Sequence, residues 1–250
     1  MSVSNITATN AQTVLTTVGG STLRGRAAAT NGNSISAGSS HLLCGYFNLD
    51  SFGGIYANYR SFMNFDLSSL SGTVTNVTIT LKRANSSNFP DLYFLASEAG
   101  NTLSNSDYQD GIVGATGYPY TSDATLFKDD ACVMNDGGSA GDTVTFTLNA
   151  AAVTHANAVI GTSNRFKTVI VNTYDYNDTY DANDDGFADG FSHQGVEFES
   201  TNTDTLGAPI LNLTISTTAQ GVGNVTLNGA KIQIVSGKFL IDWYLYQTER

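Results

Sequence analysis

Apolar and polar residues alternate with a period of two in several stretches of this chain, and this pattern most strongly limits its fold. In "FMNFDL", Met63, Phe65 and Leu67 fall on one side of an extended strand, with polar residues between them. The same alternation occurs in "VTNVTITLK" (74–82), "DTVTFTL" (142–148), "GVEFES" (195–200) and "PILNLTIS" (209–216). "RFKTVIVN" (165–172) is instead apolar on both faces at its centre, which indicates a fully buried strand. Because alternation is typical of strands with one buried face, the chain is predicted to be all-β.

The composition agrees with a globular β protein. The chain has 250 residues, of which 41% are hydrophobic and only 13% are charged, so it can bury a substantial core. One helix is predicted, in "NAAAVTHANAVIG" (149–161), where Gly161 can end it. Its apolar face comprises Ala152, Val153, Ala156, Val159 and Ile160.

The two ends of the chain differ from its middle in composition and in the pattern of apolar residues. Residues 1–29 are rich in Thr, Ser and Asn and predict an N-terminal arm with one strand at "QTVLTTV". Residues 222–247 alternate around Asn228-Gly229 and Ser236-Gly237, and Asn-Gly is a strong signal for a two-residue hairpin. We therefore predict a C-terminal three-stranded meander within residues 217–250, after a central domain at residues 30–216. The meander either mediates assembly with another copy or extends the sheets of the central domain.

An acidic segment, "YDYNDTYDANDDGFADGF" (174–191), contains six aspartates and two asparagines. Within it, "DANDDGFAD" has the spacing D-x-N-x-D-G-x-x-D, and alternating oxygen ligands around a glycine turn are what Ca²⁺ requires. The predicted calcium ligands are the side chains of Asp181, Asn183, Asp185 and Asp189 and the backbone carbonyl of Phe187. The alternative is a solvated acidic loop with Asx turns.

The calcium pattern lacks one ligand. Ser192 occupies the twelfth position, where a bidentate glutamate is usual. Asp175, Asp178 or another loop could supply the missing oxygen. The spacing therefore predicts a structural calcium site rather than a complete EF-hand.

Tyrosines in polar loops are candidate ligand-binding residues. Exposed tyrosine rings can stack on sugars, and the predicted glycan platform comprises Tyr118, Tyr120, Tyr174 and Tyr176. The alternative is that these rings shield loop backbone or lie in subunit contacts.

Recognisable catalytic motifs and histidine-based metal sites are absent from the sequence. His41, His155 and His193 lack metal-ligand spacing to one another, and no nucleophile elbow, zincin or P-loop pattern occurs. Although a carboxylate pair could meet in any fold, no glutamate has a recognisable catalytic setting. We expect no enzyme activity.

The net charge limits the classes of binding partner, and the two cysteines leave the presence of a disulfide open. The net charge is −11, so neither nucleic acid nor an anionic membrane surface is an expected partner. No apolar run approaches the roughly 18–20 residues of a membrane span, and the N-terminal sequence does not resemble a secretory signal. Virion proteins are released by lysis, which fits a virion or otherwise extracellular location. Cys44 and Cys132 could pair or remain free thiols.

Several stretches together resemble the DNRLRE-type jelly-roll domains of bacterial surface proteins and phage structural proteins. The matching stretches are "YRSFMNFDLSSLSGTVTNVTITLKR" (59–83), "VTFTLNAAAVTHANAVIGTSNRFKTVIVNTYDYND" (144–178) and "GVEFESTNTDTLGAPILNLTIS" (195–216). These domains are similar to carbohydrate-binding modules. The resemblance and the alternation both imply a jelly-roll β-sandwich. The expected core residues are Phe65, Leu67, Val77, Ile79, Leu81, Phe146, Leu148, Ile170, Phe198 and Leu213.

The expected role is that of a non-enzymatic structural protein of an extracellular particle or fibre, of the virion or tail-decoration type. Such a protein would be a homo-oligomer, or would bind other particle proteins, and would be stabilised by calcium. The alternative is a calcium-dependent carbohydrate-binding module, which would take a glycan as its ligand. A jelly-roll enzyme acting on polysaccharides has the least support in the sequence.

Overall fold

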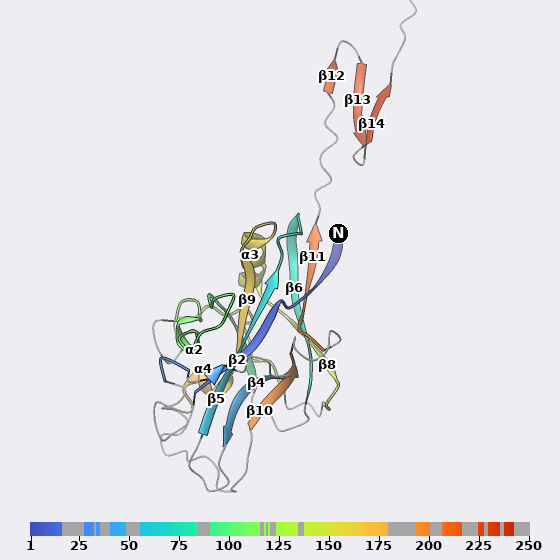
Figure 1. Cartoon of the computed structure of the whole chain (residues 1–250). Coiled ribbons are helices and arrows are strands. Elements are labelled where there is room, and N and C mark those ends of the chain that lie inside the picture. Colours follow the sequence, from blue (N-terminus) through green and yellow to red (C-terminus); the bar gives the residue numbers. More distant parts are fainter. Residues whose placement is uncertain are drawn as a thin grey trace, which may run out of the picture.

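The structure is a computed structural model of the whole chain (Figure 1). The residues it describes are 1–16, 28–32, 34–35, 41–48, 56–84, 91–115, 118, 120, 124–134, 138–179, 194–200, 207–216, 225–227, 230–235 and 238–242.

Two antiparallel sheets form the body of the described chain. The four-stranded sheet has the order β1 (Ser2–Thr7), β11 (Ile210–Ser216), β6 (Thr73–Lys82), β8 (Thr143–Thr147). The seven-stranded sheet has the order β10 (Gln194–Glu199), β4 (His41–Asn48), β5 (Tyr56–Asp66), β2 (Asn10–Thr16), β3 (Ser34–Ile35). Its remaining strands are β9 (Arg165–Asn172), which pairs with β5, and β7 (Leu92–Ala96), which pairs with β9. The predicted all-β sandwich is confirmed.

The predicted core lies in one hydrophobic cluster. All ten expected core residues are buried members of this cluster, and Phe94 and Phe146 touch within it, with ring centroids 5.1 Å apart. A second cluster, which contains Phe62, Val169 and Val171, covers the opposite face of β5 and β9. The seven-stranded sheet is therefore buried on both faces at β9, which explains why "RFKTVIVN" is apolar throughout its centre.

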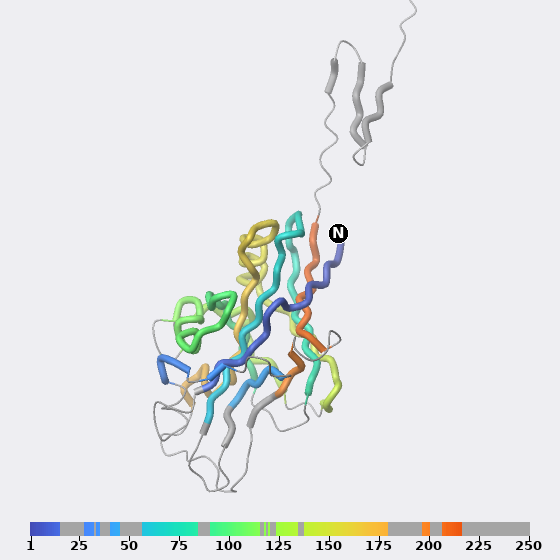
Figure 2. The backbone as a smooth tube through the Cα atoms, in the orientation of Figure 1, coloured from blue at the N-terminus to red at the C-terminus, as the bar shows by residue number. Residues whose placement is uncertain are grey.

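The strand predicted at "QTVLTTV" is present as β2 (Asn10–Thr16), but the N-terminal sixteen residues are not an arm, because residues 2–7 form a further strand that was not predicted. The two strands join the two sheets: β1 pairs with β11, and β2 pairs with β5. Figure 2 shows this blue segment beside the orange β11, although the two are far apart in the sequence. The prediction failed because β1 is an edge strand rich in Ser, Asn and Thr, so its apolar alternation is weak.

The predicted helix is confirmed as α3 (Ala150–Val159). Its N-cap is Asn149, whose side-chain oxygen accepts hydrogen bonds from the backbone N–H groups of Ala151 and Ala152. Asn157 links α3 to β6, because its amide both accepts from the Val74 N–H and donates to the Val74 carbonyl, each at 2.8 Å. Two short helices were not predicted, α2 (Asp107–Asp110) and α4 (Thr173–Asn177). None of the described helices is long and apolar enough to span a bilayer.

The C-terminal meander is present as three strands, β12 (Val225–Leu227), β13 (Ala230–Val235) and β14 (Lys238–Asp242). Leu227 pairs with Ala230, and Val235 pairs with Lys238, so two residues separate the strands at each predicted turn. These strands pair with one another and with no other described strand. The meander therefore does not extend either sheet of the sandwich by strand pairing.

The two cysteines are free and buried. Burial raises the pKa of the Cys44 thiol well above its usual value, and it raises the pKa of Cys132 to about 12. Both groups are therefore uncharged thiols at neutral pH, and the open question of a disulfide is answered in favour of free thiols.

Candidate functional site

The predicted calcium ligands lie outside the described residues. This applies to Asp181, Asn183, Asp185, Phe187 and Asp189. Among the residues that are described, no group of three or more His, Cys, Asp or Glu side chains could hold a metal ion. The calcium site therefore stays a prediction.

The four predicted platform tyrosines are placed by the structure, and they do not offer four exposed rings. Tyr120 is fully buried, and Tyr176 is 6% exposed with its ring centroid 4.2 Å from that of Tyr93. Tyr118 is half-buried and packs edge-on against Tyr120, whereas Tyr174 is 36% exposed. The rings were predicted to face water, but two of them fill the second core cluster instead.

The seven-stranded sheet forks at β5, and a buried polar site lies at this fork. On one side of β5, residues 56–59 pair with β4 and residues 61–66 pair with β9, so Arg60 lies between the two ladders. Where β4 leaves β5, side chains replace the lost ladder bonds. The Leu43 N–H donates to the Thr13 hydroxyl at 2.9 Å, and the Ser61 hydroxyl donates to the Leu43 carbonyl at 2.7 Å.

Arg60 forms a two-point ion pair with Asp175 of α4 behind this fork. Nε and an Nη atom of Arg60 donate to the two carboxylate oxygens of Asp175 at 2.7 and 2.8 Å, and both side chains are fully buried. The other Nη atom donates to the Tyr108 carbonyl at 2.5 Å. The guanidinium carbon lies 3.7 Å from the ring centroid of Tyr108 and 4.8 Å from that of Tyr120.

The hydrogen bonds around Arg60 form a closed ring. Asn172 caps α4 by accepting from the Asp175 N–H at 2.8 Å, and its amide donates to the Asn58 side-chain oxygen at 3.2 Å. The Asn58 amide donates to the Tyr108 hydroxyl at 2.7 Å, which returns to Arg60 through the Tyr108 carbonyl. We call Asn58, Arg60, Tyr108, Asn172 and Asp175 the Arg60 centre. It holds β5, β9, α2 and α4 together.

The electrostatics of the Arg60 centre keep Arg60 charged and Tyr108 neutral. Burial is the largest single effect on Arg60 and disfavours its charge, but Asp175, Tyr108 and Tyr120 together outweigh it, and the pKa of Arg60 is raised well above its usual value. Burial also raises the pKa of Tyr108 and Tyr120, against the opposing effect of Arg60. Because Arg60 keeps its charge and Tyr108 keeps its proton near neutral pH, we interpret the centre as a structural brace.

The ion pair with Arg60 excludes Asp175 as the missing calcium ligand. Asp175 was a candidate for the missing oxygen, but both of its carboxylate oxygens bind Arg60 and neither is exposed. Asp178 is half-buried, ends α4 in a left-handed conformation and is three residues closer than Asp175 to Asp181 in the sequence. Of these two candidates, Asp178 is therefore the one that remains.

The chain matches no protein-family model, and no curated protein is similar to it. The resemblance to DNRLRE-type domains therefore stays an expectation from the sequence.

Proposed function

We propose that this chain is a non-enzymatic structural protein of an extracellular particle or fibre, of the virion or tail-decoration type, and that its C-terminal sheet mediates contacts between copies. The observation that supports this proposal is the strand pairing of β12–β14. These strands form a sheet of their own, and β12 and β14 each pair on one side only among the described strands. Unpaired edges of this kind recruit other strands unless they are blocked.

The register of β12, β13 and β14 gives this sheet one apolar face. Val225 is opposite Ile232, which is opposite Ile241, and Ile234 is opposite Phe239. Because alternate positions share a face, one face carries apolar positions in all three strands. The other face includes the position of Gln233 and the cross-strand pair Lys231 and Asp242. A sheet this small is marginal in isolation, so its apolar face needs a cover, for which we propose another copy.

The test of assembly compares two lysine substitutions in the full-length chain. Ile241→Lys places a charge on the apolar face, whereas Gln233→Lys adds the same charge to the opposite face. We expect the wild type and Gln233→Lys to form oligomers by light scattering coupled to size exclusion, and Ile241→Lys to be monomeric. Circular dichroism would check that both variants keep the sandwich. A wild type that stays monomeric at all concentrations, or an Ile241→Lys variant that still assembles, would contradict the proposal.

We also propose that Ca²⁺ stabilises the protein through Asp181, Asn183, Asp185, Asp189 and the Phe187 carbonyl. What supports this is their spacing in the sequence. Calcium at about 100 times its Kd should add about 2.7 kcal/mol to the free energy of unfolding.

Thermal melts in calcium, in magnesium and in chelator would measure this calcium response. Asp181→Ala combined with Asp185→Ala should abolish it, while Asp130→Ala, which removes an exposed carboxylate elsewhere, should preserve it. An unchanged response in the double variant would place the ion elsewhere, and no response in the wild type would remove calcium from the function.

Glycan binding, the alternative, has less support. Its predicted platform depends on four exposed tyrosine rings, and two of these rings are buried.

A further inference from the structure

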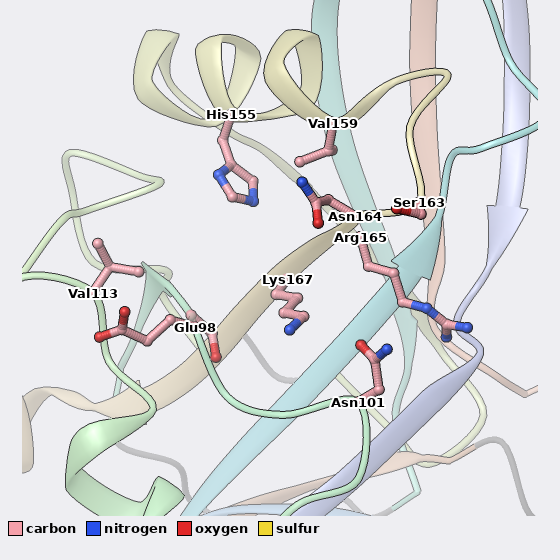
Figure 3. Close-up of a pocket in the computed structure, with 10 residues that line it drawn as sticks. Glu98, Asn101, Val113, His155, Val159, Ser163, Asn164, Arg165 and Lys167 are labelled. Carbon is pink, nitrogen blue, oxygen red and sulfur yellow. The ribbon is translucent and has the colours of Figure 1, made fainter.

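A pocket of about 430 Å³ opens at the end of the sandwich where α3 crosses β9. It is lined by His155 of α3, Lys167 of β9, Asn164 just before β9, and Glu98 and Asn101 from the loop after β7. Figure 3 shows His155 extending from α3 with Asn164 near Val159, while Lys167 lies on β9 and points away from α3 toward the loop that carries Asn101. The volume lies at the lower end of the about 300–1,000 Å³ that is usual for small-molecule sites.

The pocket contains one available cation and one available anion. Arg165 also lines the pocket, but it donates to the Thr9 hydroxyl, lies 3.8 Å from Asp66, and its guanidinium points away from His155 and Lys167 in Figure 3. Lys167 uses one of its three donors, on the Ala99 carbonyl at 2.6 Å, which leaves two N–H groups. Glu98 is exposed and forms no ion pair with any described residue.

Glu98 and Lys167 do not pair with each other. In Figure 3 the carboxylate of Glu98 turns toward Val113, and the ammonium of Lys167 points toward the loop that carries Asn101. Two opposite charges are thus held apart in one pocket. A simple anion that binds Lys167 would be repelled by Glu98, and a simple cation that binds Glu98 would be repelled by Lys167. A ligand that carries both charges satisfies the two residues together.

His155 adds an uncharged acceptor to this arrangement. Its ring packs 5.5 Å from the Phe127 centroid and 5.3 Å from that of Phe166, which fixes its orientation. Burial lowers the pKa of His155, although the Arg165 carbonyl, as an acceptor for the ring N–H, opposes this effect. The Nε2 atom is buried and has no hydrogen-bond partner among the described residues. With the proton on Nδ1, Nε2 therefore presents a lone pair that an ammonium group can use.

We propose that this pocket binds a small zwitterion of the α-amino acid class, with its carboxylate on Lys167 and its ammonium group between Glu98 and Nε2 of His155. The amides of Asn101 and Asn164 can each donate and accept, so they complete the hydrogen bonds of either charged group. Val113 and Val159 also line the pocket and suit a small apolar side chain. This site is separate from the C-terminal sheet and does not depend on its role in assembly.

Three matched ligands test the proposal by calorimetry on the full chain: L-alanine, N-acetyl-L-alanine and L-alaninamide. Only the first carries both charges. We expect L-alanine to bind at least about tenfold more tightly than either derivative, since each derivative leaves one charged residue unpaired. Saturable binding of all three with equal affinity would overturn the proposal, and so would the absence of binding by L-alanine and by the other small apolar amino acids.

Variants of the lining residues separate the contributions of the two charges. Lys167→Met should remove the preference for L-alanine over L-alaninamide, and Glu98→Gln should remove its preference over N-acetyl-L-alanine. His155→Phe keeps an aromatic ring beside Phe127 and Phe166 but deletes Nε2. It should weaken the binding of L-alanine by about tenfold. Lys82→Met removes a positive charge on β6, outside the pocket, and should leave binding unchanged. If Lys167→Met and Lys82→Met bind L-alanine equally well, the assignment of Lys167 is wrong.

Discussion

Replacing Asp175 with alanine should lower the free energy of unfolding by about 3–5 kcal/mol, because it leaves the Arg60 charge buried and unpaired. Arg60 is fully buried and would lose both of its hydrogen bonds to the carboxylate. The closed ring of hydrogen bonds would open between Arg60 and residue 175, whereas the cap of α4 would remain, because Asn172 accepts from the backbone N–H of residue 175, which alanine retains. Urea denaturation of the variant and the wild type would measure the difference.

A double-mutant cycle shows whether the pair or the unpaired charge carries this effect. Arg60→Met alone should be about as destabilising as Asp175→Ala, because it buries an unpaired carboxylate. The combined variant should lose clearly less stability than the sum of the two, since neither charge then remains.

A surface pair of the same chemistry is the matched control. Arg165→Met breaks the looser contact between Arg165 and Asp66, whose respective side chains are 26% and 40% exposed. It should lower the free energy of unfolding much less than Asp175→Ala does. An Asp175→Ala variant that is as stable as Arg165→Met would show that the Arg60 centre does not brace the fold.

Replacing Phe166 with alanine should also cost about 3–5 kcal/mol of unfolding free energy, because it opens a cavity in the main core. Phe166 is fully buried, its ring stacks on Phe127 at 5.3 Å between centroids, and Phe65 lies 6.2 Å away. Urea denaturation would measure the loss. Phe166→Leu fills part of the cavity and should cost less, and it remains informative if the alanine variant does not fold.

The Phe166 variant also connects the core to the pocket. The Phe166 ring supports His155 edge-on, so its removal should let the imidazole reorient and should weaken L-alanine binding. Val133→Ala truncates a side chain that is 63% exposed and should change neither stability nor binding. Near-native stability of Phe166→Ala would mean that this part of the core collapses around the cavity.

Much of the sandwich followed from local patterns. Strand positions such as Val77, Ile79 and Leu81 alternate with polar residues, and all three are buried as predicted. The helix at 150–159 also followed from local signals, because its Asn149 cap and its apolar spacing lie within a few residues of one another. The two-residue turns of the C-terminal meander are equally local.

The candidate sites were predicted less well, because they depend on contacts between distant residues. Arg60 and Asp175 are 115 positions apart, and nothing in the sequence around either residue indicates the other. The aspartate was therefore considered as one candidate for the missing calcium ligand, and the tyrosines near it were assigned to an exposed platform. A signal for the brace did exist: an arginine at the centre of a strand that also carries Tyr59, Phe62 and Phe65 needs a buried partner if the strand is in the core.

Local patterns were enough to predict the all-β class, the main core, the α3 helix and the C-terminal meander, because each depends on periodicity or turn chemistry within a few neighbouring residues. Three features could be seen only once the chain was folded: residues 1–16 join both sheets, β5 forks at Arg60, and His155 and Lys167 share a pocket. These features arise where the sheets and loops pack together. Burial there forces each polar group to find a partner, and that partner can come from any part of the chain.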